Sequence, residues 1–198
     1  MQGFGQRGRC HQLWEYLRTE TLDIILLQET IKESFSDQEL QSLEFADKFY
    51  WKWIPTNGHL GGLLLGIRDS TLEVGARDEG TFFLSMTILH RASRFIFEFV
   101  GVYDPANHAR SPEFLEELER KIECSTHPVA ICGDLKLIRG SRHKNNRNIK
   151  WPRVNLFNEF IARAALSEIH RTGAAFTWTN GQLNPVRSVL GRVLTSAE

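Results

Sequence analysis

Two acidic residues close apolar segments at positions where chemistry is expected. Asp134 ends the run VAICGD, and Glu29 ends the run LDIILLQE. Layered α/β proteins usually build their sites at the carboxyl ends of such strands, although a single acid there also marks a chain returning to water. Two converging carboxylates suit Mg²⁺, which takes one or two protein carboxylates and completes its shell with water and substrate phosphate. The pair therefore suggests a magnesium site.

Three hydrogen-bond donors lie in similar positions. Tyr103 and Asn107 follow another apolar segment, and Thr177 lies in the sequence FTWTN. Such hydroxyl and amide groups are suited to a phosphate whose negative charge grows in a transition state. Taken singly, Tyr103 is better explained as a packed aromatic residue and Thr177 as a β-branched strand residue. The histidines show no H-x-E or HExxH spacing, and His108 is expected to be solvated.

Charge is informative locally rather than in total. Lysine plus arginine and aspartate plus glutamate both number 24, so the net charge indicates no class of partner. Residues 135–158 nevertheless contain no acid and many bases, a composition typical of contact with phosphates. The residues that we expect to contact nucleic acid there are Arg139, Arg142, Lys144 and Arg147. The expected contact with nucleic acid depends on a second acid-free segment, residues 169–197, converging with the first beside Asp134. If the two segments diverge, both are ordinary surface.

The three cysteines show no metal-binding spacing, which argues for reduced thiols and against structural zinc. Cys132, inside an apolar run, is expected in the core. No apolar run approaches the roughly 18 residues of a membrane span, and the first twenty residues do not resemble a signal peptide. We therefore expect an intracellular chain without a membrane partner.

Apolar spacing predicts interleaved helices and strands. Helices are expected over residues 11–20, 111–123 and 151–166, with Ser111 as an N-cap and Pro112 in the first turn. Strands are expected within residues 21–30, 61–69, 82–90, 94–103, 129–134, 174–180 and 187–196. The pair flanking the polar break at residues 91–93 suits an antiparallel hairpin, so the sheet should be mixed. The pattern predicts one α/β or α+β domain over residues 1–198.

The order of short motifs carries a family resemblance. LQET is followed by GVYxP, GDxxLIRG, FTWTN and SVLxR over nearly the whole chain. In this order the chain resembles the endonuclease domain of plant LINE-type (non-LTR) retrotransposons, within the endonuclease/exonuclease/phosphatase (DNase I-like) superfamily. The resemblance implies a four-layered α/β sandwich of two mixed β-sheets flanked by helices. It also implies Mg²⁺-dependent hydrolysis of a phosphodiester in DNA.

The resemblance assigns a role to each retained residue. Glu29 matches the metal-binding glutamate, and Tyr103 matches the tyrosine that approaches the scissile phosphate. Asp134 matches the aspartate that orients or deprotonates the attacking water, and Thr177 matches a threonine that supports the site.

Two positions depart from the family motifs. Lys136 stands where GDFN has asparagine, and Gly191 stands where SxLDR has an aspartate that orients a histidine. If the chain stays extended after Asp134, Lys136 points to the same face, pairs with that carboxylate and weakens Mg²⁺ binding. The family's opening WN-x-RG strand and closing SDH motif are not found, so we expect a domain truncated at both ends that lacks the first and last strands.

These features together predict a degenerate retrotransposon endonuclease domain with little or no activity. The resemblance implies a nuclear location, DNA as the partner, and a reverse transcriptase domain in the parent element. Three alternatives stay open: a catalytically dead nucleic-acid-binding module, a phosphatase of the same superfamily, and a product that does not fold stably.

Overall fold

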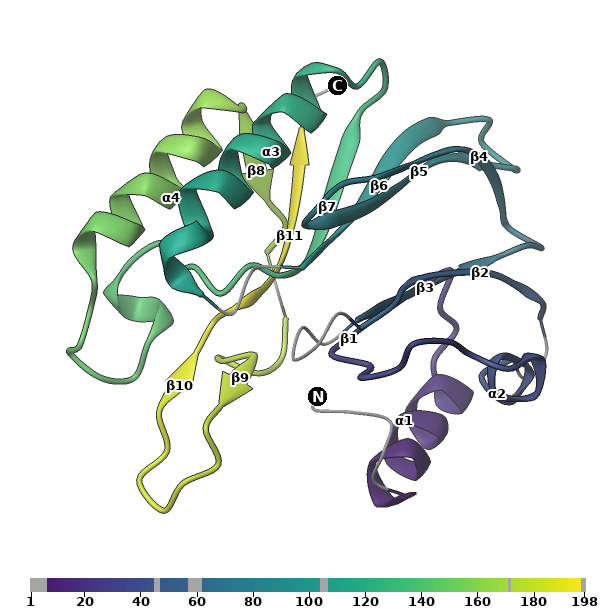
Figure 1. Ribbon diagram of the computed structural model, residues 1–198, viewed down its shortest axis with the longest axis horizontal. Coiled ribbons are helices and arrows are strands. Elements are labelled where there is room, and N and C mark those ends of the chain that lie inside the picture. The colour runs from purple at the N-terminus through teal and green to yellow at the C-terminus, as the bar shows by residue number, and fades with distance from the viewer. Residues whose placement is uncertain (1–6, 45–46, 57–61, 104–106, 171, 197–198) are drawn as a thin grey trace. The chain divides into compact units, whose positions relative to one another are not determined.

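The computed structural model describes residues 7–44, 47–56, 62–103, 107–170 and 172–196 (Figure 1). The chain divides into two compact units, each described by itself below. The first contains Met1–Asp78 and Met86–Phe97, and the second contains Glu79–Ser85 and Glu98–Glu198.

The first unit is built around a three-stranded antiparallel sheet. Along the chain it begins with α1 (Arg7–Thr19), β1 (Ile24–Gln28), α2 (Asp37–Ser42), β2 (Phe49–Ile54) and β3 (Leu63–Arg68), and part of the six-stranded sheet described next also belongs to it. Strand β3 lies between β1 and β2, and its residues are buried throughout. Leu13 and Leu17, one helical turn apart, place α1 against the apolar side chains of β1 and β3.

A six-stranded mixed sheet runs in the order β4-β5-β6-β7-β11-β8. Its strands are β4 (Leu72–Glu79), β5 (Phe83–His90), β6 (Ile96–Tyr103), β7 (Val129–Asp134), β8 (Leu166–Glu168) and β11 (Gly191–Ser196). Strands β6 and β7 pair in parallel, whereas β11 is antiparallel to both β7 and β8. A short two-stranded ribbon, β9 (Trp178–Thr179) with β10 (Arg187–Ser188), precedes β11.

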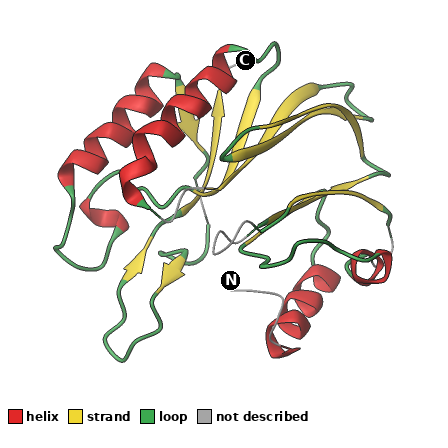
Figure 2. Cartoon of the chain, viewed as in Figure 1, coloured by secondary structure: helices red, strands yellow, loops and turns green. Residues whose placement is uncertain are grey.

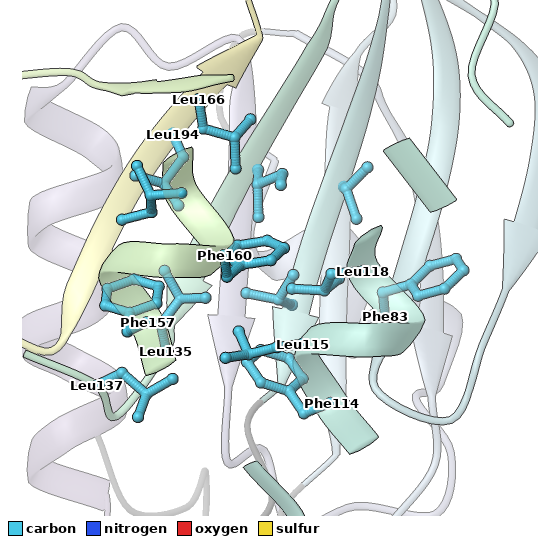
Figure 3. Close-up of a cluster of buried hydrophobic side chains, with 14 of the residues drawn as sticks. Phe83, Phe114, Leu115, Leu118, Leu135, Leu137, Phe157, Phe160, Leu166 and Leu194 are labelled. Carbon is cyan, nitrogen blue, oxygen red and sulfur yellow. The ribbon is translucent and has the colours of Figure 1, made fainter. Parts of the chain in front are cut away.

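Two helices of the second unit cover strands of the six-stranded sheet that belong to the same unit (Figures 1 and 2). They are α3 (Ser111–Glu123) and α4 (Trp151–Arg163), and short 3-10 turns η1 (His108–Arg110) and η2 (Ser141–His143) lie before each of them. Buried side chains of both helices point toward the sheet, among them Phe114 and Leu118 of α3 and Phe157 and Phe160 of α4 (Figure 3).

The predicted α/β fold of mixed sheet and flanking helices is confirmed, and the predicted N-cap of the second helix is wrong. Ser111 is not an N-cap: it is the first residue of α3 and is buried, and the cap position belongs to Arg110 without a side-chain bond. The preceding turn η1 already directs the chain into the helix, so Ser111 adopts helical geometry. Pro112 lies in the first turn as predicted.

Candidate functional site

Three positions singled out by the sequence lie side by side on neighbouring strands. Tyr103 at the end of β6 pairs in register with Asp134 at the end of β7. Gly191 at the start of β11 is the antiparallel partner of the same aspartate. Asp134 is therefore the centre of a row of three positions contributed by three adjacent strands. All three belong to the second unit.

Thr177 fixes the approach to β11. Its Oγ1 accepts hydrogen bonds from the backbone N–H of Leu190 at 2.8 Å and of Gly191 at 2.9 Å. A Cβ atom added at Gly191 would lie 3.7 Å from the side chain of Thr177, an ordinary van der Waals contact. The position opposite Asp134 therefore has room for a larger residue, and Thr177 holds the backbone that carries it.

Lys136 differs from the extended conformation assumed from the sequence. Its φ angle is +46°, in the left-handed region, and its backbone N–H donates to Oδ1 of Asp134 at 3.1 Å. The chain therefore turns immediately after the aspartate instead of continuing as a strand. The Lys136 ammonium lies 5.5 Å from the centre of the Tyr103 ring, within range of a cation–π contact. Pairing of this ammonium with the Asp134 carboxylate stays a prediction.

The surroundings of this row carry positive charge. Arg153 Nη2 donates to the carbonyl oxygen of Lys136 at 3.3 Å, which brings the first turn of α4 to the turn after β7. His108 is exposed, as expected, but its pKa is lowered. Partial desolvation of the ring is the largest cause, and the charges of Arg153, Lys136 and Lys150 add to it.

The basic residues of the acid-free segment 135–158 differ in their surroundings: some bind neighbouring groups of the protein, and others are exposed. Arg139 forms an ion pair with Glu168 at 3.1 Å and donates from Nε to Asn158 Oδ1 at 3.1 Å, so it holds the loop against α4 and β8. Arg142 and Arg147 are exposed. The Nζ atom of Lys144 donates to the carbonyl oxygen of Asn148 at 2.9 Å. Contact of these four residues with nucleic acid stays a prediction.

The two acid-free segments converge. The backbone N–H of Asn145 donates to the Arg187 carbonyl at 3.1 Å, and the Arg187 N–H donates to Asn145 Oδ1 at 2.9 Å. The N–H of Val189 donates to the carbonyl of His143 at 2.9 Å. Since the second segment continues into β11, whose first residue pairs with Asp134, the condition for a shared basic surface is met.

Arg192 is an organising residue that the sequence did not reveal. Its side chain is fully buried and forms an ion pair with Glu168. Its guanidinium also donates to the carbonyls of Leu137 and Val189, at 3.3 and 3.2 Å. An arginine in an apolar strand carries no sequence signal for this role, because Glu168 and Leu137 are 24 and 55 residues away, although Val189 is three residues away.

Glu29 immediately follows β1 and belongs to the first unit, whereas Asp134 belongs to the second. Its backbone has φ of +55°, and the following Thr30 is buried. Ile31 also has positive φ, so the segment after β1 turns sharply on both sides of Thr30. Joint ligation of a metal by Glu29 and Asp134 stays a prediction.

The strand row around Asp134 supplies a single carboxylate to a divalent cation. In the described parts of the chain no three His, Cys, Asp or Glu residues group closely enough to hold a metal. The strand neighbours of Asp134 are a tyrosine and a glycine, and one of its carboxylate oxygens accepts a backbone N–H. Nearby cationic groups repel a metal ion, and Mg²⁺ prefers an oxygen-rich, negatively charged setting.

Residues 9–186 match the model of the endonuclease/exonuclease/phosphatase family, and the chain belongs to this family. Comparison with curated protein sequences gives no match.

Three solved structures show the same fold. An AP endonuclease from Leishmania major is 15% identical, with 96% of this chain and 74% of that protein covered and a TM-score of 0.74. The endonuclease domain of TRAS1, a telomere-specific non-LTR retrotransposon, is 13% identical, with 96% and 80% covered and a TM-score of 0.66. TDP2 from D. rerio, complexed with a single-strand DNA product, is 15% identical, with 96% and 76% covered and a TM-score of 0.61.

The family defines the general chemistry, since its name covers both nucleases and phosphatases. At these identities the structural likeness establishes a shared fold, and a fold does not by itself fix a substrate. No helix among the described residues is long and apolar enough to cross a membrane.

Proposed function

We propose that the chain is a DNA endonuclease domain of LINE-type plant retrotransposon origin whose site is degenerate, with little or no nicking activity. The ordered motifs support the origin, together with the likeness to a retrotransposon endonuclease domain. The parent element would act in the nucleus and carry a reverse transcriptase domain.

One observation carries the proposed loss of activity. Both motif positions that differ from the family, Lys136 and Gly191, are neighbours of Asp134. The first follows two residues later and binds one of its carboxylate oxygens through the backbone. The second is its partner on β11. The retained aspartate thus remains in place while its immediate environment has changed.

The changed environment works against hydrolysis. A water molecule activated by Asp134 would need an available carboxylate oxygen and, nearby, groups that stabilise negative charge developing on phosphorus. Loss of one such electrostatic group typically lowers a rate by about 10²- to 10³-fold, and losses within one site are not additive. Mg²⁺ is the ion that the resemblance implies, with Glu29 as its proposed ligand. We expect its binding to be weak, because a lysine has replaced a neutral residue beside Asp134.

The test is nicking of supercoiled plasmid by the purified chain in Mg²⁺ at low salt, beside Asp134→Ala and Lys136→Asn. We expect no nicking by the wild-type chain when circular dichroism and a cooperative thermal transition show that it is folded. Metal-dependent nicking that disappears in Asp134→Ala would show a working site and overturn the proposed degeneracy.

A nucleic-acid-binding module without catalysis is the second candidate. It is favoured by the convergence of the two basic segments, whose exposed arginines include Arg142, Arg147 and Arg187. Binding of this kind releases counterions, so the logarithm of the affinity should fall steeply with the logarithm of salt concentration. Absence of DNA binding even at low salt would remove this candidate.

A further inference from the structure

Four cationic or protonatable side chains gather beyond the ends of β6 and β7. Lys136 follows β7, His108 belongs to η1, Lys150 immediately precedes α4, and Arg153 lies in the first turn of α4. We call these four residues the cation cluster. They come from three segments that the fold brings together, so their proximity is not a simple consequence of neighbouring positions in the sequence.

Three contacts define the centre of the cation cluster. The Lys136 ammonium lies over the Tyr103 ring, with 5.5 Å between the nitrogen and the ring centre. Arg153 Nη2 reaches the carbonyl oxygen of Lys136 at 3.3 Å and the Oγ atom of Ser111 at 3.5 Å. The guanidinium therefore joins the turn after β7 to the beginnings of both covering helices.

The N-termini of α3 and α4 add partial positive charge around the cation cluster. Helices α3 and α4 have 13 residues each, and neither has a side-chain hydrogen bond at its N-cap. The first N–H groups of a helix carry partial positive charge, which favours an anion nearby. The pKa of His108 is lowered first by partial desolvation and then by the charges of the other three cluster members, in keeping with their proximity.

A phosphate group matches this arrangement. Several positive charges converge on a region whose strand row contains a single carboxylate, Asp134, already engaged by a backbone N–H. Phosphate oxygens accept charge-assisted hydrogen bonds from lysine and arginine together. A divalent cation would be repelled by the same groups, whereas an oxyanion would relieve their mutual repulsion.

We propose that the cation cluster binds a phosphate group directly, with the Lys136 ammonium supplying the positive charge that a divalent metal would otherwise provide. Binding at this site is therefore independent of divalent metal. The inference rests on the proposed function only in taking a nucleic-acid phosphate as the physiological ligand; the shared chemistry is that of any phosphate group.

The central variant is Lys136→Asn. Asparagine tolerates the left-handed conformation that this position adopts, so the substitution removes the charge without disturbing the turn. The matched control is Arg120→Gln, which removes one positive charge from an exposed position on α3. Arg120 is nine residues beyond Ser111, about 14 Å along the helix at 1.5 Å per residue.

The measurement is fluorescence anisotropy of a short labelled single-stranded oligonucleotide titrated with each protein in EDTA. We expect the wild-type chain and Arg120→Gln to bind equally well, with or without added Mg²⁺. One lost phosphate contact on a single strand lowers the slope of log affinity against log salt by about 0.7. This corresponds to roughly eightfold weaker binding by Lys136→Asn at about 50 mM salt.

Inorganic phosphate, added as a competitor, distinguishes the two sources of ligand. If inorganic phosphate displaces the oligonucleotide, the site binds an isolated phosphate group. If it does not, the ligand is a phosphate of the nucleic-acid backbone. Either result supports the site, provided that Lys136→Asn binds the oligonucleotide more weakly than Arg120→Gln. Loss of wild-type binding in EDTA, or equal binding by Lys136→Asn and Arg120→Gln, would overturn the inference. The outcome is separable from that of the plasmid assay. Nicking with metal-independent binding refutes degeneracy alone, and EDTA-sensitive binding without nicking refutes the site alone.

Discussion

Replacement of Arg192 by methionine should destabilise the second unit strongly. The arginine side chain is fully buried, whereas its ion-pair partner Glu168 keeps 22% of its side chain exposed. Methionine preserves much of the length and apolar volume, and so packing against Phe157 can be retained. What disappears is the charge facing Glu168 and the donors to the carbonyls of Leu137 and Val189.

The expected cost follows from this inventory. Removal of one partner from a buried ion pair typically costs about 3 to 5 kcal/mol, because the other charge is left without compensation. Glu168 would keep its ion pair with Arg139 at 3.1 Å and some contact with water. We therefore expect the low end of the range, about 3 kcal/mol.

The loss of stability in Arg192→Met should depend on pH in a defined direction. Burial by itself would raise the pKa of Glu168, but Arg192 and Arg139 outweigh it and hold this pKa below its ordinary value. A depressed carboxyl pKa stabilises the fold at pH values above the unfolded pKa, about 4.3, and this contribution is lost as pH falls through the folded pKa. The deficit of Arg192→Met should thus be largest near neutral pH and smaller in acid.

The assay is urea unfolding at neutral and acidic pH, with Arg163→Met as the matched control. Arg163 makes two hydrogen bonds to Glu119, at 2.8 and 2.9 Å, but half of its side chain is exposed. Exposed pairs typically contribute about 0.2 to 1 kcal/mol. An Arg192→Met cost no greater than that of Arg163→Met, or one that is the same at every pH, would refute the reasoning.

Two further changes test single groups. Thr177→Val should destabilise the chain by about 1 to 2 kcal/mol, because the N–H groups of Leu190 and Gly191 lose their acceptor, whereas Thr177→Ser keeps it. Chemical denaturation measures both, and equal stabilities of the two variants would contradict the assignment. Burial raises the pKa of Cys132 to about 11, so thiol labelling near pH 8 should modify exposed Cys124 far faster. Comparable labelling rates for Cys124→Ser and Cys132→Ser proteins that both also carry Cys10→Ser would contradict this expectation.

Apolar pattern predicted most elements, and the exceptions have a physical reason. The runs containing β1, β3, β5, β6 and β7 are apolar because these strands have buried faces, and all three predicted helices were found. Strands β2, β4 and β8 and helix α2 were not predicted. Strand β4, with the sequence LEVGARDE, is an edge strand of the six-stranded sheet, and most of its residues are exposed, so no apolar pattern is needed there.

The site was predictable in part. Strand position selected Asp134 and Tyr103, which pair in register. Sequence spacing could not show that Gly191, 57 positions later, is the other neighbour of Asp134, because register between distant strands is set by tertiary packing. Nor could it show the left-handed backbone of Lys136, since no residue type at that position requires it.

The two departures from the family motifs acquire a common meaning in the structure. A lysine in place of asparagine adds one positive charge, and a glycine in place of aspartate removes one negative charge. Both changes fall beside the same retained aspartate, one in the turn after it and one on the paired strand. Together they shift the local charge by as much as a divalent cation carries. Under the proposed function, a site altered in this way would have less use for a metal and a greater affinity for the anion that the metal would have helped to hold. Tyr103 pairs with Asp134 across β6 and β7, and Thr177 binds the backbone of Gly191.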